Sequence, residues 1–593
     1  MTCPDPHSYF DSDQPRTRRL RLRLAVDFER RSLEGVVVLE LAGSDAGQLD
    51  LDTKGLSIQS VEAGEGVRVP FALGDPDPIL GRRLRLQLPP GTREVAIRYE
   101  TSPEAVGLQW LTPEQTEGKR HPFLFSQCQP IHARTMVPLQ DSPYVRVTYE
   151  AEVTLPEALT AVMSAAPGAH RPAPRPGART FRFEMPQAIP SYLLALAVGH
   201  LEPRDLSPRS RVWAEPETVE AAAWEFAGIE AMLTKAEQLF GPYEWDRYDM
   251  LVLPPSFPYG GMENPRMTFL TPTLLAGDRS LVDVVAHELA HSWTGNIVTN
   301  ATMDHFWLNE GFTVWAERRI LEALHGEAEA VLGWAIGQKA LEQSVERFGA
   351  ESPLTRLRTD LKGIDPDDAF SSIPYEKGSR LLTLIERTAG RERFDRFLRA
   401  YIDRFRFTSI TSEEFIAFLE EQLPGVAGRV EVDTWLYQAG LPKNAPVFRS
   451  PALEELTALA EGWPAGARPA PDRMRRWSPS ETLVYLQHLP RQLDSASCQW
   501  LDSAFGLSAR GNYEILVEWL TIAAGSDYPP AFDRIREVLT RVGRMKYLRP
   551  LYTALGMHAR TRALAREIFA AARLLYHTLS RRVVESVMEK YPP

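Results

Sequence analysis

Two histidines and one glutamate stand at the spacing of a zinc-binding helix. Residues 287–291 read H-E-L-A-H, an example of the pattern H-E-x-x-H. Residues spaced i and i+4 lie on one face of an α-helix, so His287 and His291 can reach the same metal ion. Glu288 stands beside a ligand, where a carboxylate can take a proton from an attacking water. The pattern therefore predicts metal-assisted hydrolysis, with Glu288 as the general base.

The remaining protein ligand must come from another part of the chain. Glu310 lies in the run W-L-N-E-G that follows the first motif. Two imidazoles and one carboxylate leave a fourth position for water, as catalytic zinc sites require. We therefore expect one Zn²⁺ per chain, held by His287, His291 and Glu310. The alternative, a chance H-E-x-x-H on an ordinary helix face, is disfavoured by the second run.

Two further features concern the start of this helix and a second carboxylate. Ser280 and Asp283 form a capping-box signature, which predicts that the zinc-binding helix begins there. Glu317 follows Glu310 by about two helical turns, and a carboxylate at that spacing can orient a metal-binding imidazole. A solvated surface charge is an equally good interpretation of Glu317.

A short run before the zinc-binding motif favours an exopeptidase. The residues of this run that we expect at the substrate are Pro258, Tyr259, Gly260, Gly261, Met262 and Glu263. Two adjacent glycines let a substrate backbone approach closely, although such a pair is usually only a turn. The Glu263 carboxylate can bind a free α-ammonium, so that only the first residue presents its carbonyl to the metal. An endopeptidase is disfavoured for this reason.

The combined motifs resemble those of the M1 family of gluzincin aminopeptidases, in particular its leukotriene A4 hydrolase and aminopeptidase B branch. The resemblance extends over nearly the whole chain, through residues 108–115 (LQWLTPEQ), 125–129 (FSQCQ), 306–313, 374–378 (PYEKG) and 543–546 (GRMK). It implies an N-terminal β saddle, a thermolysin-like catalytic domain and a C-terminal helical domain of HEAT or armadillo type. It also implies a zinc aminopeptidase that acts on short peptides with a free N-terminus.

The resemblance assigns roles to residues outside the zinc motif as well. Tyr375 corresponds to a tyrosine whose hydroxyl supports the oxyanion, and Asp367 to an acidic residue that favours a basic first side chain, Arg or Lys. The positions implied at the two ends of a bound peptide are Gln127, Cys128 and Gln129 at its N-terminus and Arg544, Met545 and Lys546 at its C-terminal carboxylate. Without the resemblance, a core tyrosine, strand glutamines, a solvated basic face and a plain turn would explain these residues.

Two positions depart from the lipid-processing members of this branch. Phe370 stands where they carry a second tyrosine, and Phe312 where they carry a histidine. These changes weigh against a second interpretation, hydrolysis of a fatty-acid epoxide such as leukotriene A4 with Asp367 directing water, but leave it open. A third interpretation is a non-catalytic peptide-binding scaffold. It would be supported by loss of a zinc ligand, Glu288 or Tyr375, and all of these are present.

The first 200 residues must supply β-structure. Strand-like runs separated by Gly, Pro and Asp clusters lie at 20–26, 35–41, 94–100 and 145–155. This texture predicts a sandwich or saddle of antiparallel strands. The Pro-, Ala- and Gly-rich stretch 165–178 is expected to be an exposed connection between two strands.

The rest of the chain changes texture twice. From about residue 202, long amphipathic segments such as 217–239 accompany a strand candidate at 249–253, which predicts an α+β domain. After a break at 440–451, helical periodicity predominates, as in 560–579. We therefore expect an α+β multidomain protein with a β domain (1–200), a catalytic domain (201–442), a linker (443–451) and an all-α domain (452–593).

Composition and charge narrow the partners. The chain is 44% hydrophobic and 24% charged, and its net charge of −11 argues against nucleic acid or an anionic membrane as a partner. No run is long and apolar enough to span a membrane, and the N-terminus lacks a signal-peptide pattern. The scattered cysteines Cys3, Cys128 and Cys498 have no metal or redox spacing, so we expect a cytoplasmic protein.

Overall fold

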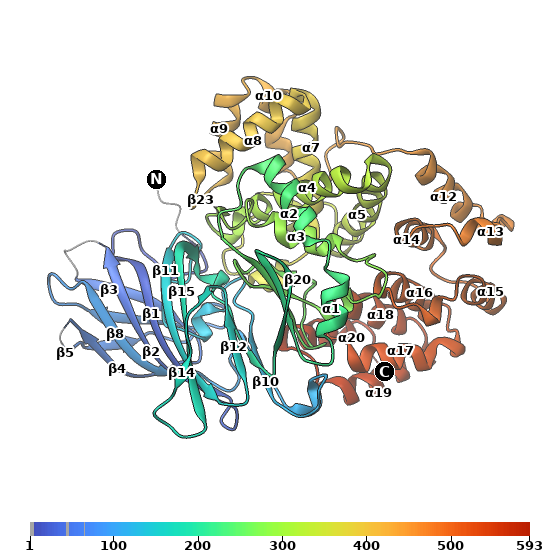
Figure 1. The fold of residues 1–593 in the computed structure, drawn as a ribbon. Coiled ribbons are helices and arrows are strands. Elements are labelled where there is room, and N and C mark those ends of the chain that lie inside the picture. The colour runs from blue at the N-terminus through green and yellow to red at the C-terminus, as the bar shows by residue number, and fades with distance from the viewer. Residues whose placement is uncertain (1–4, 43–46, 65, 593) are drawn as a thin grey trace.

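A computed structural model describes residues 5–42, 47–64 and 66–592. The predicted fold class is confirmed: a β-rich N-terminal part is followed by a mixed α+β centre and a helical C-terminal part. Figure 1 shows the blue N-terminal sheets on one side of the green and yellow centre, with the orange and red helices on the other side. The centre is therefore flanked by both of the other parts.

The N-terminal part is built from strands whose apolar residues alternate. In β1 (Arg16–Asp27), Leu20, Leu22 and Leu24 are buried, while the arginines between them are more exposed. Successive side chains of a strand point to opposite faces, so the alternation buries one face of the sheet. β1 pairs with β11 in parallel and with β2 in antiparallel orientation. Its sheet has the order β13-β15-β11-β1-β2-β8-β4-β5, with β14 paired to β15, and the other strands are β2 (Ser32–Ala42), β4 (Ser57–Ala63), β5 (Val67–Arg68), β8 (Glu94–Glu100), β11 (Arg146–Pro156), β13 (Ala166–Pro167), β14 (Arg171–Pro172) and β15 (Ala178–Pro190).

Two smaller sheets complete the N-terminal part. Their orders are β12-β16-β10-β9 and β3-β7-β6. The elements are β3 (Gln48–Thr53), β6 (Phe71–Leu73), β7 (Arg82–Gln87), β9 (Leu108–Leu111), β10 (Phe123–Ser126), β12 (Thr160–Met163) and β16 (Leu196–Gly199), with the helical turns η1 (Pro113–Gln115), η2 (Ala133–Thr135) and η3 (Ser191–Leu193). The predicted connection at 165–178 is mostly exposed, and its short strands β13 and β14 pair with β15.

The centre combines a mixed sheet with helices. The sheet has the order β17-β18-β19-β21-β20, from β17 (Glu202–Ser207), β18 (Ser210–Ala214), β19 (Tyr248–Val252), β20 (Gly261–Met262) and β21 (Thr268–Leu270). The segment predicted as one amphipathic stretch at 217–239 forms two helices, α1 (Val219–Glu225) and α2 (Ile229–Phe240). Gly228 lies at the break, where a residue that is unfavourable inside a helix begins a new one.

The remaining central elements surround the zinc motif. They are α3 (Asp283–Ala290), β22 (Val298–Asn300), α4 (Trp307–His325), α5 (Glu327–Phe348), α6 (Pro366–Ala369), the π-helical turn η7 (Ile373–Lys377), α7 (Gly378–Ala389), α8 (Arg391–Phe405), β23 (Thr408–Ile410), α9 (Ser412–Gln422), α10 (Val426–Arg429) and α11 (Val432–Tyr437), with the 3₁₀ turns η4 (Pro272–Leu274), η5 (Met303–His305) and η6 (Pro353–Thr355). The helix predicted to carry the two histidines is α3, and α4 packs against it.

The capping box predicted for this helix is wrong. Val282 occupies the N-cap position of α3 and makes no side-chain capping bond. The Ser280 hydroxyl instead accepts a hydrogen bond from Asn512 Nδ2 at 2.7 Å. The Ser280 side chain, which the local pattern assigned to capping the helix, is therefore bonded to the C-terminal part instead.

Residues 451–592 of the described chain are helical between short connections. The helices are α12 (Pro451–Glu461), α13 (Pro471–Met474), α14 (Pro479–His488), α15 (Ser495–Phe505), α16 (Tyr513–Gly525), α17 (Phe532–Arg541), α18 (Met545–Leu555), α19 (Ala559–Ala572) and α20 (Thr578–Glu589), with the turns η8 (Trp463–Ala465), η9 (Leu507–Ala509) and η10 (Pro529–Ala531). The periodic stretch at 560–579 covers most of α19 and the start of α20, with a break between them.

Two clusters of buried apolar residues form the core. One runs through the N-terminal and central parts, and the other joins the C-terminal helices to Leu332 of α5. Cys128 and Cys498 are buried and carry no disulfide, whereas Cys3 lies outside the described residues. Within the described chain, no helix combines the length and the apolar composition that a membrane crossing requires.

Candidate active site

α3 and α4 bring together the three predicted metal ligands. The shortest distance from Glu310 Oε2 is 3.5 Å to His287 Nε2 and 3.4 Å to His291 Nε2. One ligand atom from each residue lies within 4.8 Å of the others. Although burial acts in the other direction, the two neighbouring imidazoles lower the pKa of Glu310 to about 2. The three side chains therefore converge with one anionic and two nitrogen donors.

The surroundings of these residues fit a bound cation. His287 Nδ1 lies 3.0 Å from Glu317 Oε2, and His291 Nδ1 lies 3.1 Å from the Thr294 carbonyl oxygen. When Nδ1 of each ring donates to these acceptors, Nε2 keeps its lone pair toward the centre of the group. Glu310 Oε2 is buried and has no hydrogen-bond donor. A two-histidine, one-carboxylate set with a carboxylate oxygen left unsatisfied matches the donors of a catalytic zinc site.

Glu288 lies on α3, with its carboxylate against residues 258–263, called the glycine-rich run below. A Cβ atom on Gly261 would overlap this carboxylate, so a side chain at that position would displace the predicted general base. Burial, together with the nearby carboxylates of Glu263 and Glu310, raises the pKa of Glu288 to about 8. The charge of a bound divalent cation would lower that pKa.

A second carboxylate, that of Glu263, closes one side of the site. Glu263 is 4% exposed, and a ligand atom of it lies within 4.8 Å of Glu288 and His291. Its Oε1 accepts a hydrogen bond of 3.1 Å from Gln129 Nε2, and its carbonyl accepts one of 2.8 Å from Asn296 Nδ2. Burial raises the pKa of Glu263. A cation bound next to Glu263 would therefore stabilise its ionised form.

The other residues predicted at the peptide N-terminus differ in their surroundings. Gln127 Nε2 lies 3.2 Å from the sulfur of Met262, and its buried Oε1 has no hydrogen-bond donor. Cys128 is 3% exposed and packs in the hydrophobic core, where burial raises the pKa of its thiol. Among these three residues, Gln127 and Gln129 therefore contact the glycine-rich run, whereas Cys128 is part of the packing beneath.

Tyr375 lies on η7 and is half-buried beside His287, one of the predicted zinc ligands. Its ring is stacked on that of His287, with centroids 6.0 Å apart and planes at 21°. Phe306 and Phe370 each pack an edge against it at 6.1 Å. The phenol is thus held between an imidazole and two aromatic rings, near the converging ligands.

Asp367 lines a pocket next to this group. α6 carries it, and the Asp365 carboxylate caps α6 by accepting the Asp367 amide at 3.1 Å. Asp367 Oδ2 lies 3.0 Å from His132 Nε2. Residues that line the pocket with it include Gln129, Tyr259, Phe306, Phe370 and Pro374. Arg356 also lines this pocket, which therefore combines largely apolar walls with one acidic and one basic side chain.

The predicted carboxylate-binding residues come from the start of α18. The Met545 amide donates to the Pro258 carbonyl at 2.8 Å, which holds this segment beside the glycine-rich run. Arg544 is 5% exposed, and a Cβ atom on Gly260 would lie 2.7 Å from its guanidinium. Lys546 is exposed and extends to Glu514, with 2.8 Å between Nζ and Oε2. Arg544 therefore adjoins the run directly, and Lys546 lies on the Glu514 side of it.

Three models of known protein families match successive regions of the chain. The family models for the Peptidase M1 N-terminal domain, the Peptidase family M1 domain and the leukotriene A4 hydrolase C-terminal domain match residues 7–193, 224–435 and 477–588. The chain belongs to the M1 peptidase family. The resemblance proposed from the motifs is therefore confirmed.

Similar M1 proteins span the whole chain. It is 39% identical to leukotriene A-4 hydrolase of Xenopus laevis over 98% of both chains. It is 37% identical to leucine aminopeptidase 2 of Sclerotinia sclerotiorum over 99% of this chain and 100% of that protein. The structure of yeast leukotriene A4 hydrolase in complex with bestatin superposes with a TM-score of 0.91 at 32% identity, covering 99% of this chain and 97% of that one. The chain is thus a hydrolase of a zinc metallopeptidase family, and Zn²⁺ is its cofactor.

Phe312 and Phe370, the two positions predicted to differ from the lipid-processing members, lie in different surroundings. Phe312 is buried, with its ring stacked on Tyr401 at 4.9 Å. Phe370 is 38% exposed and packs an edge against both Tyr259 and Tyr375. Of the two, only Phe370 lines the pocket beside Asp367.

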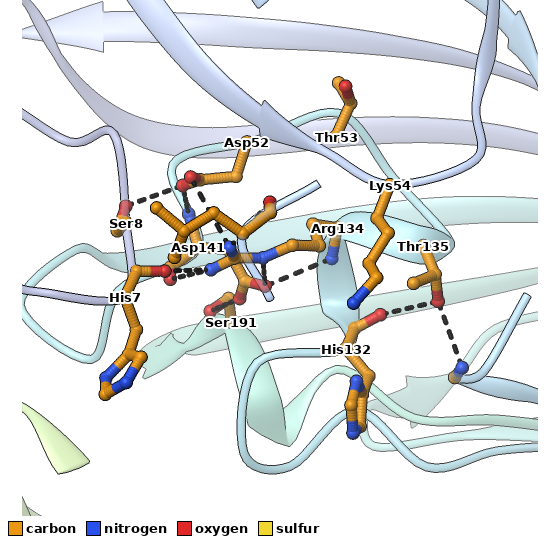
Figure 2. Close-up of polar contacts among 12 residues, drawn as sticks. His7, Ser8, Asp52, Thr53, Lys54, His132, Arg134, Thr135, Asp141 and Ser191 are labelled. Atoms are coloured by element: carbon orange, nitrogen blue, oxygen red, sulfur yellow. Dashed lines mark hydrogen bonds and ion pairs between the residues drawn. The ribbon is translucent and has the colours of Figure 1, made fainter. Parts of the chain in front are cut away.

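His132 adjoins the M1 site but was not identified from the sequence. It precedes η2, whose Arg134 is fully buried and donates from Nε to Asp141 at 2.9 Å and from Nη2 to the His7 carbonyl at 2.6 Å. Figure 2 shows this network on one side of the turn, with the His132 ring pointing away from it. Arg134 thus holds the turn from which His132 reaches Asp367. A lone histidine carries no local signal for such a contact.

Proposed function

We propose that this M1 hydrolase is an aminopeptidase that releases single residues from the N-terminus of short peptides. The observation that carries the proposal is the buried Glu263 carboxylate beside His291 and Glu288. A buried anion is costly without a cation, and the α-ammonium of a peptide supplies one. A substrate anchored in this way offers its first peptide bond to the general base.

The residues of the site divide the reaction between them. When bound, zinc supplies Lewis-acid chemistry, polarising the scissile carbonyl and lowering the pKa of water. Glu288 accepts a proton from the attacking water and returns it to the leaving amine. Tyr375 donates a hydrogen bond from its hydroxyl to the developing oxyanion. Glu263, which accepts a hydrogen bond from Gln129, binds the α-ammonium.

Charged groups at the two ends of the site favour a class of substrate. Arg544, which adjoins Gly260, and Lys546 attract the C-terminal carboxylate of a short peptide. Asp367 in the adjoining pocket favours Arg or Lys as the first residue. Short peptides with a free N-terminus and a basic first residue are therefore the proposed substrates.

A panel of aminoacyl-p-nitroanilides tests this proposal. We expect release of p-nitroaniline from the Arg and Lys substrates to exceed release from the Ala and Leu substrates. A zinc chelator should stop the release, and added Zn²⁺ should restore it, because the donors of His287, His291 and Glu310 suit a catalytic zinc ion. Release led by Ala or Leu would keep the aminopeptidase and contradict the role of Asp367.

Glu263→Gln should lower kcat/KM for these substrates by about 10- to 100-fold, the range expected for losing a hydrogen bond to a charged group. The amide keeps the size of the side chain but cannot neutralise the α-ammonium. Glu215→Gln is a matched control, because Glu215 is also buried but accepts hydrogen bonds from the backbone amides of Glu117 and Gly118. An unchanged kcat/KM in Glu263→Gln would refute the ammonium anchor.

Epoxide hydrolysis is a second candidate activity. It is supported by the apolar walls of the pocket, which include Met303, Leu354 and Leu357 beside Asp367, and which suit a fatty-acid chain. A protein loaded with zinc that releases no p-nitroaniline but converts a fatty-acid epoxide to a diol would favour this candidate over the aminopeptidase.

A further inference from the structure

The residues that flank Tyr375 on η7 are anchored by buried polar contacts. Lys377 is 1% exposed, and its Nζ donates to the carbonyls of Thr355 at 3.0 Å and Gln438 at 2.9 Å. Glu376, which directly follows the tyrosine, is 7% exposed. π-helical turns are rare overall, and those that do occur are often found at functional sites. The backbone that presents the tyrosine is therefore held from its C-terminal side.

Two arginines hold the Glu376 carboxylate. Arg318 of α4 donates from Nη2 to Oε1 at 2.7 Å and from Nη1 to Oε2 at 3.1 Å. Arg380 of α7 donates from Nη1 to Oε2 at 2.7 Å. Charge-assisted bonds of this kind, one pair of them bidentate, fix both the direction and the distance of a carboxylate.

The packing around this carboxylate leaves it little freedom. A Cβ atom on Gly337 of α5 would overlap both Glu376 oxygens, so the helix approaches to contact distance only because glycine stands there. On α4 and α7, Gly311 and Gly378 also meet closely, and a Cβ on Gly311 would lie 2.8 Å from the Gly378 Cα. Trp334 of α5 covers Arg318, whose guanidinium carbon lies 4.0 Å from the ring centroid.

The same stretch of α4 serves the zinc ligands. Glu317, whose carboxylate contacts His287 Nδ1, is followed directly by Arg318. Gly311, which contacts the start of α7, follows the ligand Glu310 directly. Neighbouring residues of α4 therefore contact the proposed metal ligands on one side and the turn that carries Tyr375 on the other.

We propose that Glu376 is a positioning residue for Tyr375. Its ion pairs with Arg318 and Arg380 set the distance between η7 and α4, and thereby the place of the phenol relative to the zinc ligands. The inference rests on the role proposed above for the Tyr375 hydroxyl. Glu376 touches no reacting atom, so its effect passes entirely through the tyrosine.

A double-mutant cycle tests this coupling on the zinc-loaded protein. Glu376→Gln should lower kcat for Arg-p-nitroanilide by about 10- to 100-fold, because a small misplacement of a catalytic group has effects of this size. KM should change little, since the ground-state contacts at Glu263 remain. In a Tyr375→Phe background, Glu376→Gln should lower kcat no further. An equal fold-loss in both backgrounds would overturn the proposal, as would an unchanged kcat in Glu376→Gln.

Failure of the underlying role gives a different pattern. If Tyr375→Phe alone kept full kcat, the tyrosine would have no part in turnover. The oxyanion role of Tyr375 and the positioning role of Glu376 would then be overturned together. A loss in Tyr375→Phe with additive effects of Glu376→Gln would overturn the positioning role alone.

Gly337→Ala approaches the same question without changing a charge. The added methyl presses on the Glu376 carboxylate, so we expect the same loss of kcat, again absent in the Tyr375→Phe background. Gly333→Ala on the same helix is the matched control, because its Cβ would meet only Arg318 Nε at 3.9 Å, an ordinary contact. Zinc content and melting temperature of each variant are measured alongside. A Gly337→Ala variant that binds zinc, is folded and keeps full kcat would contradict the proposal.

Discussion

Glu288→Gln should abolish peptide hydrolysis while zinc stays bound. We expect kcat to fall by at least about 10²- to 10⁴-fold, the range attributed to a general base. His287, His291 and Glu310 are unchanged in this variant, so the metal affinity should remain. The amide has the shape of the carboxylate and fits against Gly261, but it cannot accept the proton of the attacking water. Metal content is measured by elemental analysis and kcat with Arg-p-nitroanilide.

Glu310→Gln is the control that separates loss of the base from loss of the metal. Glu310 provides the anionic donor of the ligand set. The loss of activity in Glu310→Gln should therefore be accompanied by a lower zinc content. The two variants then fail for distinguishable reasons. Near-normal turnover in Glu288→Gln would contradict the mechanism, whatever its zinc content.

The convergence of the three residues proposed as zinc ligands could be predicted because their geometry is local. The spacing of His287 and His291 places both on one face of α3, whatever the rest of the chain does. Glu310 and Glu317 lie on a single helix, so their separation also follows from helical periodicity. Fold class followed in the same way, since strand alternation such as that of β1 is a property of a few consecutive residues.

Contacts between distant segments could not be predicted. The pair of His132 and Asp367 and the cluster around Glu376 join residues far apart in the chain. A buried arginine or histidine has the same appearance in a sequence as an exposed one. Only the packing of α4, α5 and α7 shows that Arg318 faces a carboxylate. The resemblance to a family supplied the proposed roles of residues such as Tyr375, for which the local pattern also allowed a core aromatic.

The wrong capping box has the same cause. Ser280 and Asp283 satisfy a rule for isolated helix ends, but Ser280 is hydrogen-bonded to Asn512 at the start of α16. A side chain that can bond in two ways takes the partner that the assembled fold supplies. Local rules therefore predicted which helix exists here but not how it begins.

Tyr375→Phe should lower kcat by about 10²- to 10³-fold, the loss found when one oxyanion donor is removed. KM should change little, because the hydroxyl is proposed to bond to charge that develops only in the transition state. Phe306, Phe370 and His287 pack around the ring, so phenylalanine should keep its place without the hydroxyl. Zinc content should equal that of the wild type, since none of the ligands is altered.

Tyr401→Phe is the control for losing a phenol hydroxyl elsewhere in the central part of the chain. Tyr401 is 1% exposed and stacks on Phe312, and it belongs neither to the three predicted zinc ligands nor to the lining of the pocket beside Asp367. We expect Tyr401→Phe to keep the wild-type kcat, so that a loss in Tyr375→Phe reports the oxyanion and not the removal of any phenol. If Tyr375→Phe instead raised KM at constant kcat, the hydroxyl would bind the ground state and the transition state equally. Its role would then be substrate binding, and zinc would be left as the proposed source of oxyanion stabilisation.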